Sequence, residues 1–244
     1  MHHSGRRAPK RALGSHRYDA GVLAGRVVVV TGGEAGIGQA IALGLEGVHA
    51  TVVAVDGGFS SRAEAEAAFA AVREAAGGLD AVVHAFVDPA ALTPQPLAET
   101  AEGEWDRRCA AVLRAALYCC QAAARELSGR GGRLVLVTPT IALTGAADLV
   151  PYATAVEGMR AMAKSAARQW GEWGVSVNCV APPVELMAPG TPPPAGVVFA
   201  PPALGRDPDG RADVAPVVAL LASDAAHMVT GVTIPVDGGV VMAP

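Results

Sequence analysis

The chain has 244 residues, a length that suits one domain with a substantial core. Its formal net charge of −4 and its pI of about 5.9 argue against nucleic acids and anionic membranes as partners. No apolar run is as long as a membrane span and the amino terminus has no apolar signal region, so we expect a cytoplasmic protein without membrane contact.

The first 24 residues carry five basic side chains and little apolar pattern. We predict that they form a flexible basic arm before a domain that spans residues 25–244. The alternative is an arm that docks on a partner.

Residues 26–38 have the pattern of a strand, a glycine-rich turn and the start of a helix. The amides and the positive dipole end of such a helix attract pyrophosphate, and glycines let the backbone approach it. Asp56 ends the next apolar run, 18 positions after Gly38, where an acid that binds ribose belongs. The alternatives are a turn that only closes a strand–helix–strand unit and an Asp56 that only caps its strand. The predicted cofactor-binding residues are Gly32, Gly33, Glu34, Gly36, Ile37, Gly38 and Asp56.

Farther along the chain, predicted strands alternate with predicted helices. This order predicts a single-domain, doubly wound α/β fold with a mostly parallel sheet. The proline-rich residues 182–208 are the expected lid or substrate loop. Helices are expected at 60–76, capped by Ser60 or Ser61, and at 102–127, 152–171 and 212–221; strands are expected at 79–87, 133–137, 174–180 and 232–236.

The helix expected at 102–127 is apolar nearly all round in its centre. A helix without a polar face is covered on more than one side, so we expect the sheet on one side and a second subunit on the other. The cysteines have no metal-ligand spacing, which predicts reduced thiols and no metal site. They are Cys109, Cys119, Cys120 and Cys179.

Over about residues 24–242 the sequence resembles the short-chain dehydrogenase/reductase family. The resemblance implies an NAD(P)-binding Rossmann fold whose subunits pair through the helices around 104–127 and 152–171. It rests on the glycine-rich turn at 31–38, Leu79-Asp80, Trp105-Asp106-Arg107, Tyr152, and the stretches 177–182, 204–206, 221–224 and 230–239, all in family order.

The region between Asp56 and Leu79 has room for one helix only. The family usually places a helix, an edge strand and a second helix there. We therefore predict that the third family strand is missing and that the adenine pocket is open on that side.

The catalytic positions depart from the family pattern. The family uses a Tyr as general acid/base, and Tyr152 matches it, but Val156 occupies the place of the Lys four residues later. On a helix those two positions share a face, so this phenol lacks the ammonium that would lower its pKa. Lys164 lies about 18 Å farther along the helix and cannot replace it.

The two remaining catalytic positions are also altered. Pro139 stands where the family has its catalytic Ser, and Val112 stands at the catalytic Asn. Thr138 and Thr140 flank the proline and are the hydroxyl donors that remain. The candidate catalytic residues are therefore Tyr152, Thr138 and Thr140.

The nicotinamide end of the family site is altered as well. The family's Asn-Asn-Ala-Gly corresponds to His84-Ala85-Phe86-Val87 in this sequence. Phe86 and Val87 are therefore larger than the small residues that normally line the cofactor there. His84 is either a substitute acid/base or a packed, hydrogen-bonded core residue. Met187 occupies the place of a Thr that often binds the carboxamide.

For a bound dinucleotide, Asp56 and Glu34 favour NAD over NADP, because a 2′-phosphate would face two carboxylates and no nearby Arg except Arg62. Repulsion at ~4 Å costs about 1–4 kcal/mol per charge pair.

Three functions follow from this mixture. The favoured one is a non-catalytic or regulatory subunit that pairs with an active relative; such pairs are known in the family's antibiotic-pathway members, which oxidise a carrier-bound β-hydroxy amino acid. The first alternative is a divergent NAD(P)-dependent oxidoreductase that acts through Tyr152 on a small hydroxyl or carbonyl substrate. The second is a repurposed site for elimination, isomerisation or cyclisation. The expected assembly is a homodimer, a homotetramer or a hetero-oligomer with an active relative.

Overall fold

The computed structural model describes residues 21–191 and 201–242. The predicted basic arm therefore lies outside the described residues, except for its last four positions. These four residues form a turn in which the Leu23 side chain is fully buried, so they pack with the domain.

Six strands form one sheet in the order β2-β1-β3-β4-β5-β6, and all five pairings are parallel. The α/β fold predicted from the alternating pattern is thus confirmed, with a sheet that is parallel throughout. The strands are β1 (Val27–Thr31), β2 (Thr51–Val55), β3 (Ala81–His84), β4 (Gly132–Val137), β5 (Val175–Ala181) and β6 (Thr233–Pro235).

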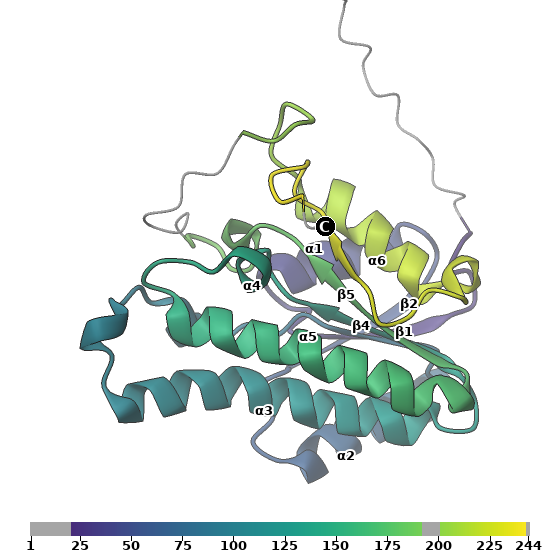
Figure 1. The fold of residues 1–244 in the computed structure, drawn as a ribbon. Helices are drawn as coiled ribbons and strands as arrows, with labels where there is room; N and C mark the ends of the chain where they lie inside the picture. Colours follow the sequence, from purple (N-terminus) through teal and green to yellow (C-terminus); the bar gives the residue numbers. More distant parts are fainter. Residues whose placement is uncertain (1–20, 192–200, 243–244) are drawn as a thin grey trace, which may run out of the picture.

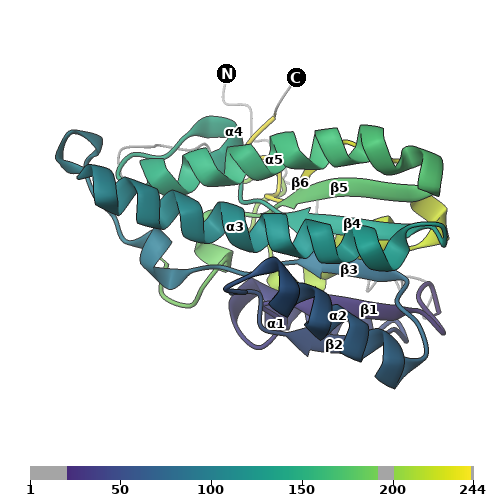
Figure 2. The ribbon, with the colours of Figure 1, turned by 90° about the horizontal axis from the view of Figure 1, so that it is seen from below.

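Helices cover both faces of the sheet (Figure 1). One face carries α1 (Gly36–Glu46) and α6 (Ala215–Ala222), which contact each other. The other carries α2 (Arg62–Ala76), α3 (Glu102–Leu127) and α5 (Val150–Trp170), seen in front of the sheet in Figure 2. Strands covered on both faces are buried, which explains why β1 begins with four consecutive valines.

The third family strand is missing, as the short segment after Asp56 predicts. One helix, α2, leads from the edge strand β2 directly to β3, which lies on the other side of β1. This crossover runs in the opposite direction to the one through α1. Since both must be right-handed, α2 lies on the opposite face from α1 and packs against α3.

Local signals set the ends of α2. The Ser61 hydroxyl accepts a hydrogen bond from the Glu64 amide at 3.2 Å, and Gly77 follows the last turn in a left-handed conformation. These are the expected cap and stop.

Intramolecular packing accounts for much of the apolar surface of α3. Its flanks contact α2 and α5, and at the second contact Leu113 lies against Gly158. The side that faces away from the sheet keeps Leu117 at 40% exposure. The sheet and two helices of the same chain therefore cover its other sides, and a second subunit on the remaining side stays a prediction.

Short helical turns connect the main elements. They are η1 (Pro89–Leu92), η2 (Leu97–Glu99), α4 (Ile141–Thr144), η3 (Gly171–Trp173), η4 (Val184–Leu186), a π-helical turn η5 (Gly210–Val214) and η6 (Asp224–Ala226). The proline-rich segment contains η4, and its residues 192–200 lie outside the described part of the chain.

Candidate functional site

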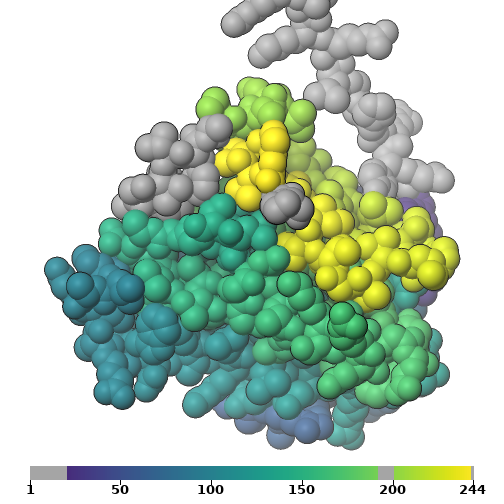
Figure 3. Space-filling model, viewed as in Figure 1, coloured from purple at the N-terminus to yellow at the C-terminus, as the bar shows by residue number. Residues whose placement is uncertain are grey.

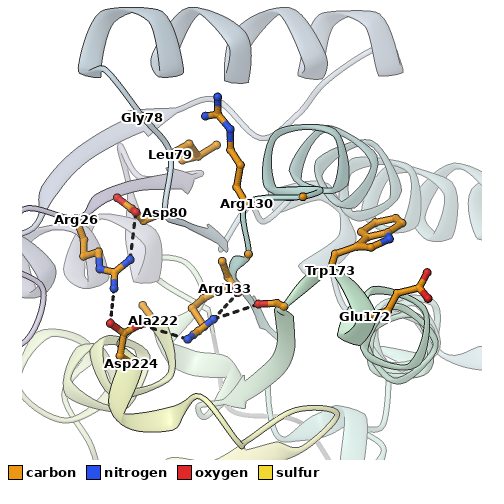
Figure 4. A pocket seen from close by; sticks show the side chains of 14 residues that line it. Arg26, Gly78, Leu79, Asp80, Arg130, Arg133, Glu172, Trp173, Ala222 and Asp224 are labelled. Carbon is orange, nitrogen blue, oxygen red and sulfur yellow. Dashed lines mark hydrogen bonds and ion pairs between the residues drawn. The ribbon is translucent and has the colours of Figure 1, made fainter.

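A hollow of about 770 Å³ lies at the amino ends of the strands (Figure 4). Four of its charged groups bond to one another, because Arg26 bonds to Asp80 and Asp224, and Arg133 bonds to Asp224. Ligands of doubly wound sheets bind at the opposite edge, outside the carboxyl ends of the strands. We therefore assign this hollow to the structural ion network that joins the strand ends.

A second cavity, of about 300 Å³, lies at the carboxyl edge of the sheet. Gly32, Glu34, Gly36 and Asp56 line it, as the sequence predicts for a cofactor site. The other predicted residues, Gly33, Ile37 and Gly38, are buried behind this wall. The remaining lining residues are Ala35, Val55, Ala85, Phe86, Val87, Pro89, Met187, Ala188 and Pro189.

The glycine-rich turn is held close to its neighbours. Gly32 has a φ of +69° and its amide bonds to the Val55 carbonyl at 2.8 Å. A Cβ at this position would lie 2.7 Å from the Phe86 Cα, so only glycine fits here. The first amides of α1 have no side-chain cap, since Ala35 is the residue before the helix.

Both acids of the cavity are exposed at its mouth. The Asp56 Oδ1 atom accepts a hydrogen bond from the Gly58 amide at 2.9 Å, which fixes the carboxylate just beyond β2. Glu34 lies on the turn itself. No Lys or Arg lines the cavity, so its charge is negative.

Met187 covers the start of α1 with its backbone. Its carbonyl oxygen accepts a hydrogen bond from the Ile37 amide, with 3.4 Å between oxygen and nitrogen. A Cβ on Gly36 would lie 2.5 Å from the same oxygen. The Ile37 amide belongs to the amino-terminal amides of α1, which are the groups that would hold a pyrophosphate. Sequence reasoning flagged the Met187 side chain and missed this contact, since a backbone carbonyl has no residue-type signal.

The cavity in this form does not fit an intact dinucleotide. Its volume is at the lower end of the range for small-molecule pockets, about 300–1,000 Å³. The Met187 carbonyl accepts a hydrogen bond from the Ile37 amide, and none of the candidate catalytic residues lines the cavity. The residues predicted for the cofactor and those predicted for catalysis therefore do not share this cavity.

Phe86 lies on the side where the third strand is missing, and it packs against Gly57 and Gly58 there. A Cβ on Gly58 would lie 3.1 Å from the tip of the phenylalanine ring. Gly57 and Phe59 are buried, while Asp56 and Gly58 are exposed. Whether an adenine ring enters from this side stays a prediction.

Tyr152 lies in the first turn of α5 and is 1% exposed. Burial raises its pKa above the ordinary value of 10.0, in the direction opposite to that needed for a general base. Val156, one turn later on the same face, is equally buried and brings no charge. Lys164 is exposed farther along the helix.

The two threonines are buried beyond the end of β4. The Thr138 side chain is fully buried and its hydroxyl has no hydrogen-bond partner among the residues that the structure describes. Thr140 begins α4, and its amide bonds to the Pro182 carbonyl at 2.8 Å. The Asn position is equally apolar, because Val112 is 5% exposed.

His84 is a packed core residue. Its Nδ1 atom lies 2.8 Å from the Thr31 hydroxyl, across the register pair that joins β3 to β1. Burial lowers its pKa from 6.5 to about 4, so the ring is neutral near pH 7. A neutral ring held by a threonine and enclosed on all sides agrees with the structural interpretation rather than the catalytic one.

The thiols offer no further chemistry. Burial raises the pKa of Cys120 to about 12 and that of Cys179 to about 11, which keeps both protonated. All four cysteines are free. Within residues 21–191 and 201–242 no group of three His, Cys, Asp or Glu side chains is placed to hold a metal ion, and no helix there has the length and hydropathy of a membrane span.

Comparison with known proteins gives a consistent family. Residues 25–241 match the family model described as enoyl-(acyl carrier protein) reductase. The chain is 30% identical over 261 residues to an NADPH-dependent aldehyde reductase-like protein of Arabidopsis thaliana, covering 90% of this chain and 95% of that one. It is 30% identical to L-xylulose reductase of Bos taurus, covering 89% and 97%.

A solved structure has the same fold. The crystal structure of a protein assigned to the short-chain dehydrogenases/reductases, from Burkholderia xenovorans, superposes with a TM-score of 0.74 and 27% identity. The match covers 90% of this chain and 98% of the other.

Proposed function

Because this chain belongs to the short-chain dehydrogenase/reductase family, we propose that it is a family subunit that transfers no hydride itself and acts by pairing with an active relative. Family membership implies a nicotinamide dinucleotide, NAD(P), as the cofactor type of this fold. The chain keeps the turn and the acid of that site but has lost the groups that would use it.

The environment of Tyr152 carries the proposal. General acid–base catalysis needs a group whose pKa lies near the working pH and is typically worth 10²–10⁴-fold in rate. Here burial raises the pKa of the phenol, and valine, proline and valine replace the three groups that assist it in the family. The other candidate acid/base, His84, is enclosed and bonded to Thr31.

A nicotinamide absorbance assay tests whether the chain alone transfers hydride. We expect no change in NADH or NADPH absorbance with short-chain aldehydes, ketones or hydroxy compounds, and no difference between the wild type and Tyr152→Phe. A rate in the wild type that Tyr152→Phe abolishes would instead make the chain a divergent oxidoreductase. A new product without cofactor turnover would indicate elimination, isomerisation or cyclisation.

If pairing opens this cavity for a dinucleotide, its charge favours NAD over NADP. Glu34 and Asp56 would face a 2′-phosphate, and Arg62 is committed to Glu66 at 2.6 Å. Equal affinities for the two cofactors in the complex would contradict this preference.

The outer sides of α3 and α5 are the proposed pairing surface, which faces the viewer in the lower part of Figure 3. Leu117 is its exposed apolar residue. We expect Leu117→Glu to weaken association with an active family member, or with a second copy, at least tenfold in analytical ultracentrifugation, because it places a charge at a desolvated centre.

Leu43→Glu is the matched control for this experiment. Leu43 is 41% exposed against 40% for Leu117, but it lies on α1 on the opposite face of the sheet. Equal loss in both variants, or a wild-type monomer that neither binds nor stimulates any relative, would contradict the pairing role.

A further inference from the structure

We propose that the free edge of β2 pairs antiparallel with β2 of a second copy of this chain. The inference concerns a surface other than the outer sides of α3 and α5, and it does not depend on the pairing role. It follows from the backbone groups of the edge, the symmetry of its register and the small side chains beside it.

Alternate residues of β2 direct their backbone groups away from the sheet, at whose edge the strand lies in Figure 2. The Thr51 amide donates to a carbonyl just before β1, and the Val55 carbonyl accepts an amide just after β1, each at 2.8 Å. The odd-numbered positions thus bond to β1, and the positions between them point to the other side. Val52 and Ala54 therefore present four backbone groups at the edge, and no strand in the described part of the chain pairs with them.

The edge is self-complementary in one antiparallel register. A two-fold axis through Val53 places Val52 of each copy opposite Ala54 of the other. Opposite residues of a hydrogen-bonded antiparallel pair exchange both N–H···O bonds, so these two pairs use every outward group of Val52 and Ala54 in both copies. A charged side chain or a proline commonly protects an edge strand, and β2 contains neither. A second copy therefore satisfies the edge without any other partner.

The helix beside the edge leaves room for this second copy. Helix α2 contacts β1 and β2, and its Glu66 and Arg73 side chains bond to α3, which lies toward the middle of the sheet. The side of α2 away from α3 therefore faces the free edge. The residues that recur on this side at helical spacing are Glu64, Ala68, Ala71 and Ala75.

Pairing of the two edges would bring α2 and its copy together. Two strand spacings separate their axes, which is about 10 Å and close to the distance between packed helices. Small side chains suit this distance. Because the two-fold axis reverses the second helix, Ala68 lies opposite Ala71 near the middle, and Glu64 lies opposite Ala75. The two Glu64 carboxylates therefore do not meet.

A proline at the edge tests the contact by analytical ultracentrifugation of the full chain. Ala54→Pro removes an outward amide and keeps the bonds between β2 and β1, because only the odd-numbered positions make those bonds. We expect it to weaken self-association at least tenfold. The matched control Ala54→Ser keeps the amide and should change self-association less than twofold.

Both variants are compared in the Leu117→Glu background, so that association through α3 and α5 does not mask association through the edge. Circular dichroism checks that each variant is folded. Equal association in the Ala54→Pro and Ala54→Ser variants would overturn the proposal, and so would a chain with the natural Ala54 that stays monomeric up to millimolar concentration in this background.

Hydrogen exchange tests the same contact without a substitution. We expect the Val52 and Ala54 amides to exchange at least tenfold more slowly at high than at low protein concentration. The Val53 amide faces β1 and should exchange slowly at both concentrations. Protection of Val52 and Ala54 that does not depend on concentration would show that another part of the same chain covers the edge, and would overturn the proposal.

A disulfide tests the register. In Val53→Cys the new thiol would face its own copy at a non-hydrogen-bonded pair, where Cα atoms lie about 4.5 Å apart, within the range of disulfides. Oxidised glutathione should link the two copies and leave as two molecules of reduced glutathione. Thr51→Cys is the matched control, because it would face Val55, and it should link at least tenfold less. Equal linkage in the two variants would overturn the register through Val53.

The outcome is distinguishable from failure of the proposed function. Self-association that Leu117→Glu abolishes would overturn this inference and support the surface on α3 and α5. A chain that oxidises or reduces a nicotinamide cofactor would overturn the pairing role and leave the edge contact to the tests above.

Discussion

His84 makes the stability of the fold sensitive to acid. Its pKa is about 4 in the folded protein against 6.5 for an exposed histidine, so the unfolded chain binds the extra proton. Stability is therefore fully present above pH 6.5 and is lost as the pH falls toward 4. At about 1.4 kcal/mol per pH unit, the loss is about 3 kcal/mol.

Urea denaturation at pH 7 and at pH 4.5 measures this effect. Part of the acid loss should disappear in His84→Asn, which keeps a polar group opposite Thr31 but does not titrate. His227→Gln, at an exposed position, should keep the wild-type pH dependence. A wild-type stability that is equal at the two pH values would contradict the buried, neutral state of His84.

At the residue scale, the sequence was most informative where another residue type replaces a catalytic residue of the family. The substitutions Val156, Pro139 and Val112 are visible in the sequence, and the structure adds that both valines are buried. The sequence was least informative where a backbone atom, rather than a side chain, makes a contact at the site. The carbonyl of Met187 closes the start of α1 whatever the side chain is, and residue type carries no signal for that.

Arg133 lies at the amino end of the sheet, and Figure 4 shows its guanidinium beside Asp224. Its guanidinium donates to the carbonyl oxygens of Gly132, Gly174 and Ser223 at 2.9–3.5 Å, with only 13% of the side chain exposed. The charge-assisted hydrogen bonds to the carbonyls of Gly132 and Ser223 are part-buried and contribute more than the ion pair to Asp224, whose side chain is 72% exposed.

We expect Arg133→Ala to lower the free energy of unfolding by about 2 kcal/mol. Arg130→Ala is its matched control, since Arg130 is exposed and lies in the same hollow, and it should change stability by less than about 0.5 kcal/mol. Chemical denaturation followed by circular dichroism gives both values. A loss of similar size in the two variants would show that the carbonyl contacts do not carry the effect.

Elements with a strong period or explicit end signals were predicted closely from the sequence. The long helix was expected at 102–127 and α3 has these bounds, and the Ser61 cap and the Gly77 stop fix α2. The strand expected at 79–87 ends at His84 in the structure, because the chain turns away from the sheet there. The short helical turns η1 and η4 were not predicted, since runs of three or four residues show no periodicity.

The missing third strand leaves β2 as the edge of the sheet, and this affects the molecule as a whole. The edge is short and apolar, with Thr51 and Ala54 exposed, and among residues 21–191 and 201–242 it pairs only with β1. An apolar edge with free amides and carbonyls promotes association with other strands. This tendency should be greatest near the pI of about 5.9, where charge repulsion between molecules is smallest.

We therefore expect Thr51→Lys to reduce the rate of aggregation at pH 6, measured by light scattering at 40 °C, at least threefold. A lysine on an edge strand opposes docking of a second strand because it would have to lose its water. Thr93→Lys adds the same charge at an exposed position away from the sheet edge, so it separates the edge effect from the shift in net charge. If both lysines slow aggregation equally, net charge rather than the free edge of β2 controls the association of this fold.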